Sequence, residues 1–254
     1  MLYNSMPTMK RIGFESHAKL DVFKRKVEQA QNLVEKALKQ MDRPYCAFST
    51  GKDSQVASHL VWSVNPNIPG VYWDADCAYP ESYEYLDLIA QERTIIKWKC
   101  EPMLDTFERL GGPDAPGIEN ATMKSTVYDP LKELLAKYHF DGVFVGLRAE
   151  ESRGRANSIK YDGTLWQYKR DDVLRCLPVA HFSYKDIWAY IVSCNLPYNR
   201  IYDKMWNMYE REQRVSYWAG ESNRSMGRWY LLRTQYPELW NKFAARFPEV
   251  RQFC

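Results

Sequence analysis

Residues 44–62 read Pro-Tyr-Cys-Ala-Phe-Ser-Thr-Gly-Lys-Asp-Ser-Gln-Val-Ala-Ser-His-Leu-Val-Trp, and the rest of the chain is best interpreted from this segment. The apolar run at 45–48 predicts a short buried strand. The chain then turns at 49–51, and a helix is expected next because apolar residues recur at Val56, Leu60 and Val61. A strand, a turn of small residues and a helix direct backbone N–H groups towards an anion. We therefore expect a phosphate-binding loop.

The side chains of this loop suit that role. Ser49 and Ser54 supply hydroxyls, Lys52 supplies an ammonium group, and Asp53 is a candidate ligand for Mg²⁺. A Walker A loop is disfavoured because Cys46 occupies the position of that motif's first glycine. A serine- and glycine-rich turn also occurs in α/β proteins that bind no ligand, so the loop alone does not decide the function.

Further strands and helices alternate along the chain. Strands are predicted at 71–73, 94–98 and 143–145, and helices at 80–91 and 130–139. This alternation favours an α/β fold, with a Rossmann-like parallel sheet, helices on both of its faces and a helical extension at the C-terminus. Ligands of such sheets bind beyond the carboxyl ends of the strands. The loops at 49–54, 74–80 and 146–155 are expected at that edge.

The remaining segments are assigned from local patterns. Residues 1–15 lack periodicity and are expected to form an arm. Residues 16–41 predict one amphipathic helix with Ser16 as its N-cap, and residues 183–192 predict another with Ser183 as its N-cap. A hairpin turning at Asp162-Gly163 is predicted over 159–168. The predicted domains are an N-terminal arm and helix at 1–43, a nucleotide-binding domain at 44–203 and a helical extension at 204–254.

Composition is that of an ordinary globular protein. The chain has 254 residues, of which 45% are hydrophobic and 26% charged, and its formal net charge is +3. No 18-residue apolar stretch or apolar N-terminal run occurs, so we expect a cytoplasmic protein without a membrane segment. Its six cysteines include no C-x-x-C pair, and no histidine lies near them at zinc-finger spacing. Neither a zinc site nor an iron–sulfur cluster is expected.

A second polar segment, residues 146–155, directly follows a predicted buried strand. It reads Gly-Leu-Arg-Ala-Glu-Glu-Ser-Arg-Gly-Arg. Its three arginines can donate in pairs to phosphate or sulfate oxygens. Glu150 and Glu151 either coordinate Mg²⁺ or pair with those arginines. Alone, such a segment is as well explained by solvated loop charge; its place at the edge of the phosphate-binding loop favours a site.

These segments resemble the adenine nucleotide α-hydrolase (PP-loop) superfamily. Residues 49–54 match its S-x-G-K-D-S loop. The nearer resemblance is to the branch of phosphoadenosine phosphosulfate (PAPS) reductases and the small subunit of bacterial ATP sulfurylase. Asp74 with Tyr79-Pro80-Glu81, the segment at 146–152 and Leu196-Pro197-Tyr198-Asn199 follow in that branch's order. Four ordered motifs over about residues 44–203 are far more specific than one.

The resemblance implies a role for each matching residue. Lys52, Asp53 and Arg148 would be catalytic, and Mg²⁺ would accompany the nucleotide. The substrate would be ATP, PAPS or adenylyl sulfate (APS), and the reaction would act at the α-phosphate linkage. The residues that would bind the nucleotide or its phosphates are Ser49, Thr50, Gly51, Lys52, Asp53, Ser54, Asp74, Gly146, Arg148, Glu151, Ser152 and Arg155.

The departures from the family pattern leave two alternatives open. One is a PAPS reductase using a thiol donor, although the C-terminal E-C-G-L-H segment of those enzymes is replaced by Arg-Gln-Phe-Cys at 251–254. The other is a catalytically inactive nucleotide-binding regulatory module. The cysteines that hold an iron–sulfur cluster in the APS-reducing branch are also missing. A second protein subunit or a homo-oligomer remains an open prediction.

Residues 204–254 lie outside the resemblance. Tryptophans, tyrosines and arginines alternate there, for example at Trp206, Trp218, Arg224, Trp229 and Arg233. A nucleic-acid surface has this composition, but a helical cap with buried aromatics and solvated arginines is the favoured interpretation.

Overall fold

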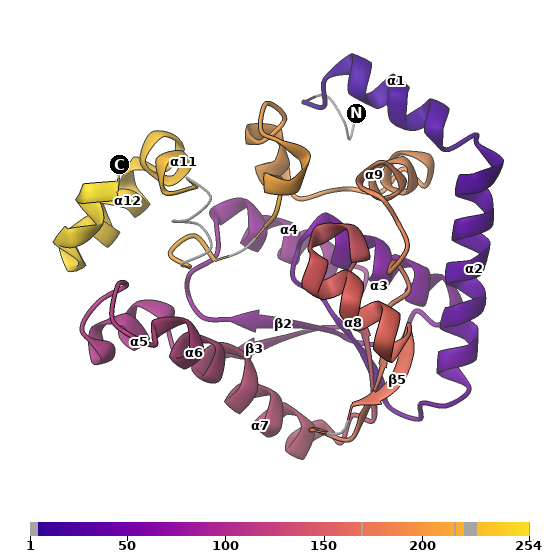
Figure 1. Ribbon diagram of the computed structural model, residues 1–254, viewed down its shortest axis with the longest axis horizontal. Coiled ribbons are helices and arrows are strands. Elements are labelled where there is room, and N and C mark those ends of the chain that lie inside the picture. The colour runs from indigo at the N-terminus through magenta and orange to yellow at the C-terminus, as the bar shows by residue number, and fades with distance from the viewer. Residues whose placement is uncertain (1–4, 169, 216, 221–227, 254) are drawn as a thin grey trace. The chain divides into compact units, whose positions relative to one another are not determined.

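The computed structural model describes residues 5–168, 170–215, 217–220 and 228–253, and its helices and strands are labelled in Figure 1. One six-stranded sheet runs in the order β3-β2-β1-β4-β6-β5. The strands are β1 (Pro44–Ala47), β2 (Gly70–Asp74), β3 (Ile95–Lys99), β4 (Gly142–Val145), β5 (Leu165–Tyr168) and β6 (Val173–Cys176).

The sheet is mostly parallel. β1 pairs in parallel with β2 and with β4, and β4 pairs in parallel with β6. The edge strand β5 runs antiparallel to β6. Burial follows this arrangement, since Cys46 of β1 and Phe144 of β4 lie opposite each other and are fully enclosed. The predicted α/β fold is confirmed, with one antiparallel edge strand added.

Helices connect the strands. In chain order they are α1 (Thr8–His17), α2 (Asp21–Leu38), α3 (Lys52–Val64), α4 (Pro80–Ala90), α5 (Met103–Leu110), α6 (Ile118–Met123), α7 (Asp129–Tyr138), α8 (Arg153–Asp162), α9 (Tyr184–Ser193), α11 (Arg228–Gln235) and α12 (Pro237–Arg246). A π-helical turn spans Lys124–Tyr128. Short 3₁₀ segments lie at Ala149–Glu151, Arg200–Lys204, Glu210–Glu212 and Pro248–Phe253.

Two predictions at the ends of elements are wrong. Residues 1–15 are not an arm throughout, because α1 begins at Thr8, and the helix predicted over 16–41 begins only at Asp21. The chain breaks between α1 and α2 because Leu20 has extended backbone angles and is exposed rather than part of the apolar stripe. Ser16 therefore lies inside α1 and caps nothing.

The predicted hairpin over 159–168 is also wrong. Residues 153–162 form α8 with Ser152 as its N-cap, and Gly163 ends it with a positive φ of 82°. The hairpin lies one element later, between β5 and β6. By contrast, α9 begins after Ser183 as predicted, and the Ser183 hydroxyl accepts a hydrogen bond from the Asp186 amide.

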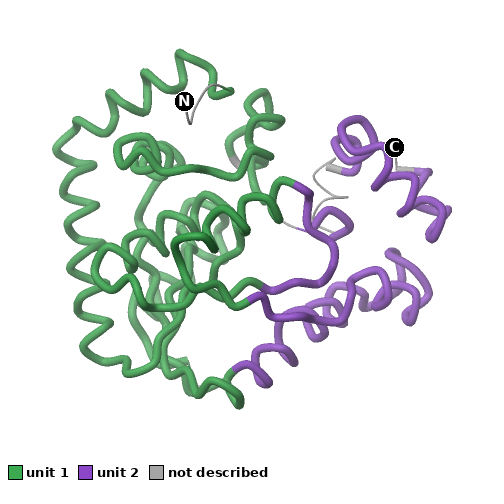
Figure 2. Tube along the Cα trace, turned by 180° about the vertical axis from the view of Figure 1, so that it is seen from behind, with its two compact units in different colours: residues 1–72, 81–96, 135–215 green, residues 73–80, 97–134, 216–254 purple. Residues whose placement is uncertain are grey.

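The chain forms two compact units, shown in Figure 2. The first comprises Met1–Tyr72, Glu81–Ile96 and Leu135–Val215, and the second comprises Trp73–Pro80, Lys97–Leu134 and Ser216–Cys254. This division does not coincide with the boundaries expected after residues 43 and 203, which stay predictions.

In the first unit α3 occupies a central place. It packs against β1 and β4 and is flanked by α2 and α9. Two of its residues, Leu60 and Val61, are fully buried. Because this helix is held on several sides, its first turn is fixed relative to the ends of β1 and β4.

The second unit has an aromatic core. The rings of Trp218, Trp229 and Trp240 each contact Phe243, with centroids 5.5, 5.3 and 6.4 Å away. All four are buried. Trp206, in the first unit, is buried against Trp188. The tryptophans of the C-terminal segment are therefore core residues, as predicted, whereas Tyr209 and Tyr230 are exposed.

Within the part of the chain that the structure describes, no helix is both long enough and apolar enough to cross a membrane.

Candidate functional site

The loop at 49–54 joins β1 to α3. Thr50 has a φ of 61°, a left-handed conformation that costs a non-glycine residue about 1–3 kcal/mol. Asn199 holds it there, because its side-chain amide donates to the carbonyl and hydroxyl oxygens of Thr50 at 3.4 and 3.3 Å. Both residues are buried. The Leu-Pro-Tyr-Asn segment at 196–199 thus positions the loop from a distance in the sequence.

The two serines brace the turn from inside. The Ser54 hydroxyl donates to the Gly51 carbonyl at 2.9 Å and accepts from the Ser49 amide and hydroxyl at 3.2 and 3.1 Å. Gly51 is the N-cap of α3 and has extended backbone angles. The first turn of a helix therefore faces the loop, which is the arrangement that favours anion binding.

Lys52 is the first residue of α3 and is 1% exposed. Its Nζ donates to Asp53 Oδ2 at 2.9 Å and to the Gln213 carbonyl at 3.0 Å. The ammonium group also lies 5.9 Å from the ring centroid of Tyr184 and 5.6 Å from that of Tyr202. Burial lowers the pKa of Lys52, although Asp53 counteracts it.

Asp53 is shared between two cations. Its Oδ1 accepts from Nε of Arg148 and its Oδ2 accepts from Lys52. Burial alone would raise the pKa of Asp53, but the charges of Lys52 and Arg148 outweigh it and hold the pKa below its ordinary value. Each carboxylate oxygen of Asp53 thus accepts one charge-assisted hydrogen bond and keeps a further lone pair, so its role as a ligand for Mg²⁺ stays a prediction. The described residues also include no group of three or more His, Cys, Asp or Glu suited to a metal ion.

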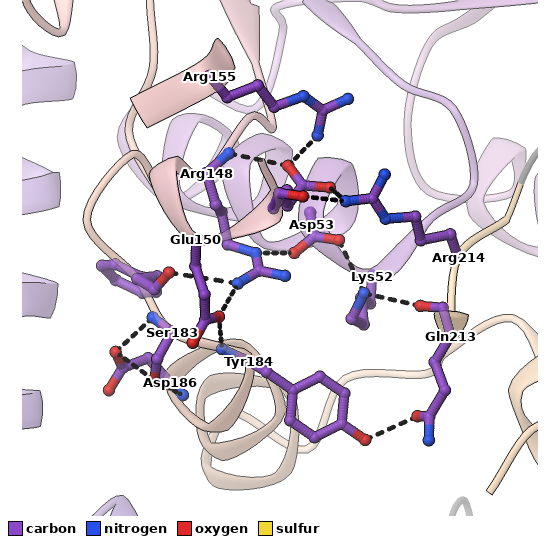
Figure 3. A network of polar contacts seen from close by, with 12 residues as sticks. Lys52, Asp53, Arg148, Glu150, Arg155, Ser183, Tyr184, Asp186, Gln213 and Arg214 are labelled. Carbon is purple, nitrogen blue, oxygen red and sulfur yellow. Dashed lines mark hydrogen bonds and ion pairs between the residues drawn. The ribbon is translucent and has the colours of Figure 1, made fainter. Parts of the chain in front are cut away.

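The segment at 146–155 completes the network, shown in Figure 3. Arg148 Nη1 donates to Glu150 and to the Phe182 carbonyl, and Glu150 Oε2 accepts from the Tyr184 amide at 2.6 Å. Burial would lower the pKa of Arg148, but Asp53 and Glu151 outweigh it, so the pKa is raised. Arg148 therefore stays charged while almost fully enclosed.

Glu151 joins three arginines. One of its oxygens accepts from the Arg148 amide at 3.0 Å and pairs with the Arg155 guanidinium, and the other lies 3.4 Å from Nη2 of Arg214. Arg214 also donates to the Glu151 carbonyl at 3.0 Å. Glu151 and Arg155 thus form an ion pair with each other.

Gly146 and Ser152 have local structural roles. A β-carbon at Gly146 would lie 2.5 Å from the Ser54 nitrogen and 2.6 Å from the Asp53 carbonyl group. The glycine therefore lets β4 approach the backbone of α3. The contact of Gly146 with the nucleotide stays a prediction. Ser152 is the N-cap of α8 and accepts from the Arg155 amide at 3.2 Å. Asp74 belongs to the second unit, where it pairs with Lys99.

A cavity of about 400 Å³, here called the Lys52 cavity, opens beside the network. It is lined by three cations, three carboxylates and two tyrosines: Lys52, Arg148, Arg214, Glu150, Glu151, Glu210, Tyr184 and Tyr209. The volume lies within the range of small-ligand sites. An anion entering here would meet buried cations that the protein has already removed from water.

Sequence reasoning missed five residues of this site. Tyr184 and Gln213 hydrogen-bond each other at 2.7 Å, and Tyr209, Glu210 and Arg214 line the Lys52 cavity. Gln213 and Arg214 are more than 150 residues from Lys52, so no spacing could link them. The only signal in the sequence was that arginines are frequent in the segment around them.

The sequence of the chain is similar to those of known reductases. The model of the phosphoadenosine phosphosulfate reductase domain matches residues 43–230. A phosphoadenosine 5'-phosphosulfate reductase of Xylella fastidiosa is 26% identical, covering 64% of this chain and 68% of its own. An adenosine 5'-phosphosulfate reductase of Bacillus cytotoxicus is 30% identical, covering 62% and 66%. The chain spans about two thirds of the length of each.

Solved structures show the same fold. A PAPS reductase from Candida auris, in a phosphate complex, superposes with a TM-score of 0.56 at 15% identity, over 69% of this chain and 84% of its own. An FMN adenylyltransferase from Candida glabrata, in complex with ATP, gives 0.55 at 13% identity, over 79% and 68%. Because the family model covers most of the chain, including the loop at 49–54 and the segment at 146–155, this protein belongs to the phosphoadenosine phosphosulfate reductase domain family.

Proposed function

We propose that this chain is an enzyme that binds ATP or a sulfated adenine nucleotide (PAPS or APS) and acts at the α-phosphate linkage by adenylyl, sulfate or sulfur transfer. The observation that carries the proposal is the network of Lys52, Asp53 and Arg148, which joins the first turn of α3 to the end of β4 beside the Lys52 cavity. The names of the family's relatives support a nucleotide of this class.

Lys52 and Arg148 suit phosphate oxygens for physical reasons. Both are at most 5% exposed, so the cost of removing them from water is met during folding rather than on binding. Asp53 fixes both in place. Glu150, whose side chain is 52% exposed, is the partner that an incoming anion can displace from Arg148.

The same cations would act in the reaction. Charge grows on phosphate oxygens when a nucleophile attacks the α-phosphate or when a sulfate group is transferred. Fixed donors inside a cavity stabilise this charge without rearranging, which lowers the barrier more than the same donors in water would. Lys52, Asp53 and Arg148 are the residues we propose as catalytic, and the loop at 49–54 as the phosphate cradle.

The second candidate is reduction of PAPS or APS by a thiol. The names of the relatives favour it. The described cysteines do not. Burial raises the pKa of Cys46 and Cys100 to about 12, and it also raises the pKa of Cys77, Cys176 and Cys194, which suppresses the reactive thiolate. Cys254 lies outside the described residues.

Product analysis tests the proposal. Purified protein is incubated with ATP, APS or PAPS, with and without Mg²⁺ and a dithiol, and pyrophosphate, sulfite and nucleotide products are measured. We expect turnover of at least one nucleotide, lost in Lys52→Ala and retained in Lys36→Ala, which removes an exposed lysine of α2. Sulfite release that requires the dithiol would favour the second candidate. Nucleotide binding without turnover would favour the inactive regulatory module instead.

A further inference from the structure

A second and larger cavity lies in the first unit, on the hairpin side of β4. Its volume is about 700 Å³, and we call it the Trp166 cavity. Its walls come from the end of β4, from α8 and from the β5–β6 hairpin; α8 and β5 lie together in Figure 1. Apart from Arg155, which belongs to the segment at 146–155, its aromatic and basic residues are used neither by the matched motifs nor by the proposed function.

The hairpin places three of these residues on one face. Trp166 and Arg175 are directly paired across the antiparallel ladder, and Tyr168 lies two residues beyond Trp166. Directly opposed residues, and residues two apart on a strand, share a face of the sheet. The Arg175 guanidinium carbon accordingly lies 3.5 Å from the ring centroid of Tyr168. Trp166 and Tyr168 are both half-buried, so each ring is partly open.

The floor of the cavity is apolar and its rim is basic. Trp166 packs on a buried cluster that includes Ile159 and Leu177. The charged residues of the lining are three arginines (Arg155, Arg170 and Arg175) and one aspartate (Asp162). Arg155 and Arg175 also pair with Glu151 and Asp171, which are not part of the lining.

Arg175 has a donor that the chain does not use. Its Nη2 donates to Asp171 at 2.8 Å. Its Nε is buried and has no hydrogen-bond acceptor in the part of the chain that the structure describes. A buried N–H without an acceptor is energetically unfavourable, so a ligand oxygen that reached it would be favoured.

The two cavities share a wall. Arg155 lines the Trp166 cavity and pairs with Glu151, which lines the Lys52 cavity. Leu147 and Arg148, adjacent in sequence, line one cavity each. A ligand in the Trp166 cavity would therefore lie next to the residues we propose to hold the nucleotide.

We propose that the Trp166 cavity is a second binding site, and that it takes a flat aromatic ligand carrying a carboxylate or phosphate. The ring would lie against Trp166 over the apolar floor, and the anionic group would meet the arginines of the rim. Aromatic stacking and guanidinium–anion pairs are both strong enough to select such a ligand. Its further role as the acceptor in the transfer reaction rests on the proposed function; its binding does not.

Calorimetric titration with naphthalene-2-carboxylate, and with its uncharged analogue naphthalene-2-carboxamide, tests the site. We expect the full-length protein to bind the carboxylate at least about tenfold more tightly than the carboxamide, because a charge-assisted hydrogen bond exceeds a neutral one. Arg175→Gln should abolish this preference, and Trp166→Leu should weaken both ligands by about tenfold. Arg175→Lys and Trp166→Phe serve as conservative variants in case the first pair fails to fold; each should lose less affinity.

The controls separate this site from the Lys52 cavity. Arg25→Gln removes an exposed arginine of α2 and should leave the binding of naphthalene-2-carboxylate unchanged. Lys52→Ala should also leave it unchanged, even if that variant binds no nucleotide. Affinity that is insensitive to all four cavity substitutions would overturn the proposal. So would equal binding of the two ligands, no binding of either, or displacement of naphthalene-2-carboxylate by ATP.

Discussion

At the scale of single residues, the site depends on buried charges of opposite sign that neutralise one another. Asp53 is the only carboxylate that contacts both Lys52 and Arg148 within the described part of the chain. Removing one partner from a buried ion pair leaves an uncompensated charge, which costs more than the pair itself contributes. Asp53 is therefore expected to stabilise the folded loop as well as to position the two cations for a ligand.

We predict that Asp53→Asn lowers the free energy of unfolding by about 3–5 kcal/mol, because Lys52 and Arg148 lose their shared counterion. Urea denaturation at neutral pH measures this. Asp21→Asn, at a position whose side chain is 83% exposed, should change the value by no more than about 0.5 kcal/mol. Equal stability of the two variants would show that the buried network contributes nothing particular.

At the scale of elements, one carboxylate ties three helices together. Asp186 in the first turn of α9 accepts from Lys26 of α2 at 2.6 Å and contacts His17 of α1 at 2.7 Å. It also accepts from the amide of Ser183 at 2.7 Å, which completes a capping box. Burial would raise the pKa of Asp186, but Lys26, His17 and Ser183 outweigh it and lower the pKa to about 2.

This shift predicts a pH dependence of stability. Since the pKa of Asp186 falls on folding, its charged form stabilises the protein above the unfolded value of 3.8, and the contribution is lost as the pH falls towards 2. We expect Asp186→Asn to cost about 2 kcal/mol at pH 6, with a difference that shrinks between pH 4 and 2. Urea unfolding of both proteins across this range measures it. A difference that is constant with pH would refute the assignment.

The contact between β4 and α3 gives a second prediction for elements. Gly146→Ala would place a β-carbon against backbone atoms that cannot move without shifting α3. We expect a loss of about 1–3 kcal/mol in unfolding free energy, accompanied by weaker nucleotide binding. Gly154→Ala in α8 is the matched control, because the nearest atom lies at 3.9 Å, and there alanine should stabilise by about 0.5–1 kcal/mol. Thermal unfolding of the two variants distinguishes them.

At the scale of the whole molecule, the sheet could be predicted because strand, turn and helix signals are local. The loop at 49–54, the ends of β1 and β4 and the cap at Ser183 all follow from short patterns. Three features did not. The break at Leu20 and the start of α8 directly after Ser152 depend on local backbone angles, and Arg214 is brought to the site only by the fold. Residues that act together across more than 60 positions leave no periodic signal.

The proposed function requires that the Lys52 cavity binds an adenine nucleotide through its buried cations. Titration calorimetry with ATP, APS and PAPS, on the unmodified protein and on Lys52→Ala and Lys36→Ala, measures this binding. We predict saturable binding of at least one nucleotide, weakened about 10- to 100-fold in Lys52→Ala because a charge-assisted hydrogen bond is lost, and unchanged in Lys36→Ala. Binding of none of the three nucleotides, or equal affinity in Lys52→Ala, would contradict the claim.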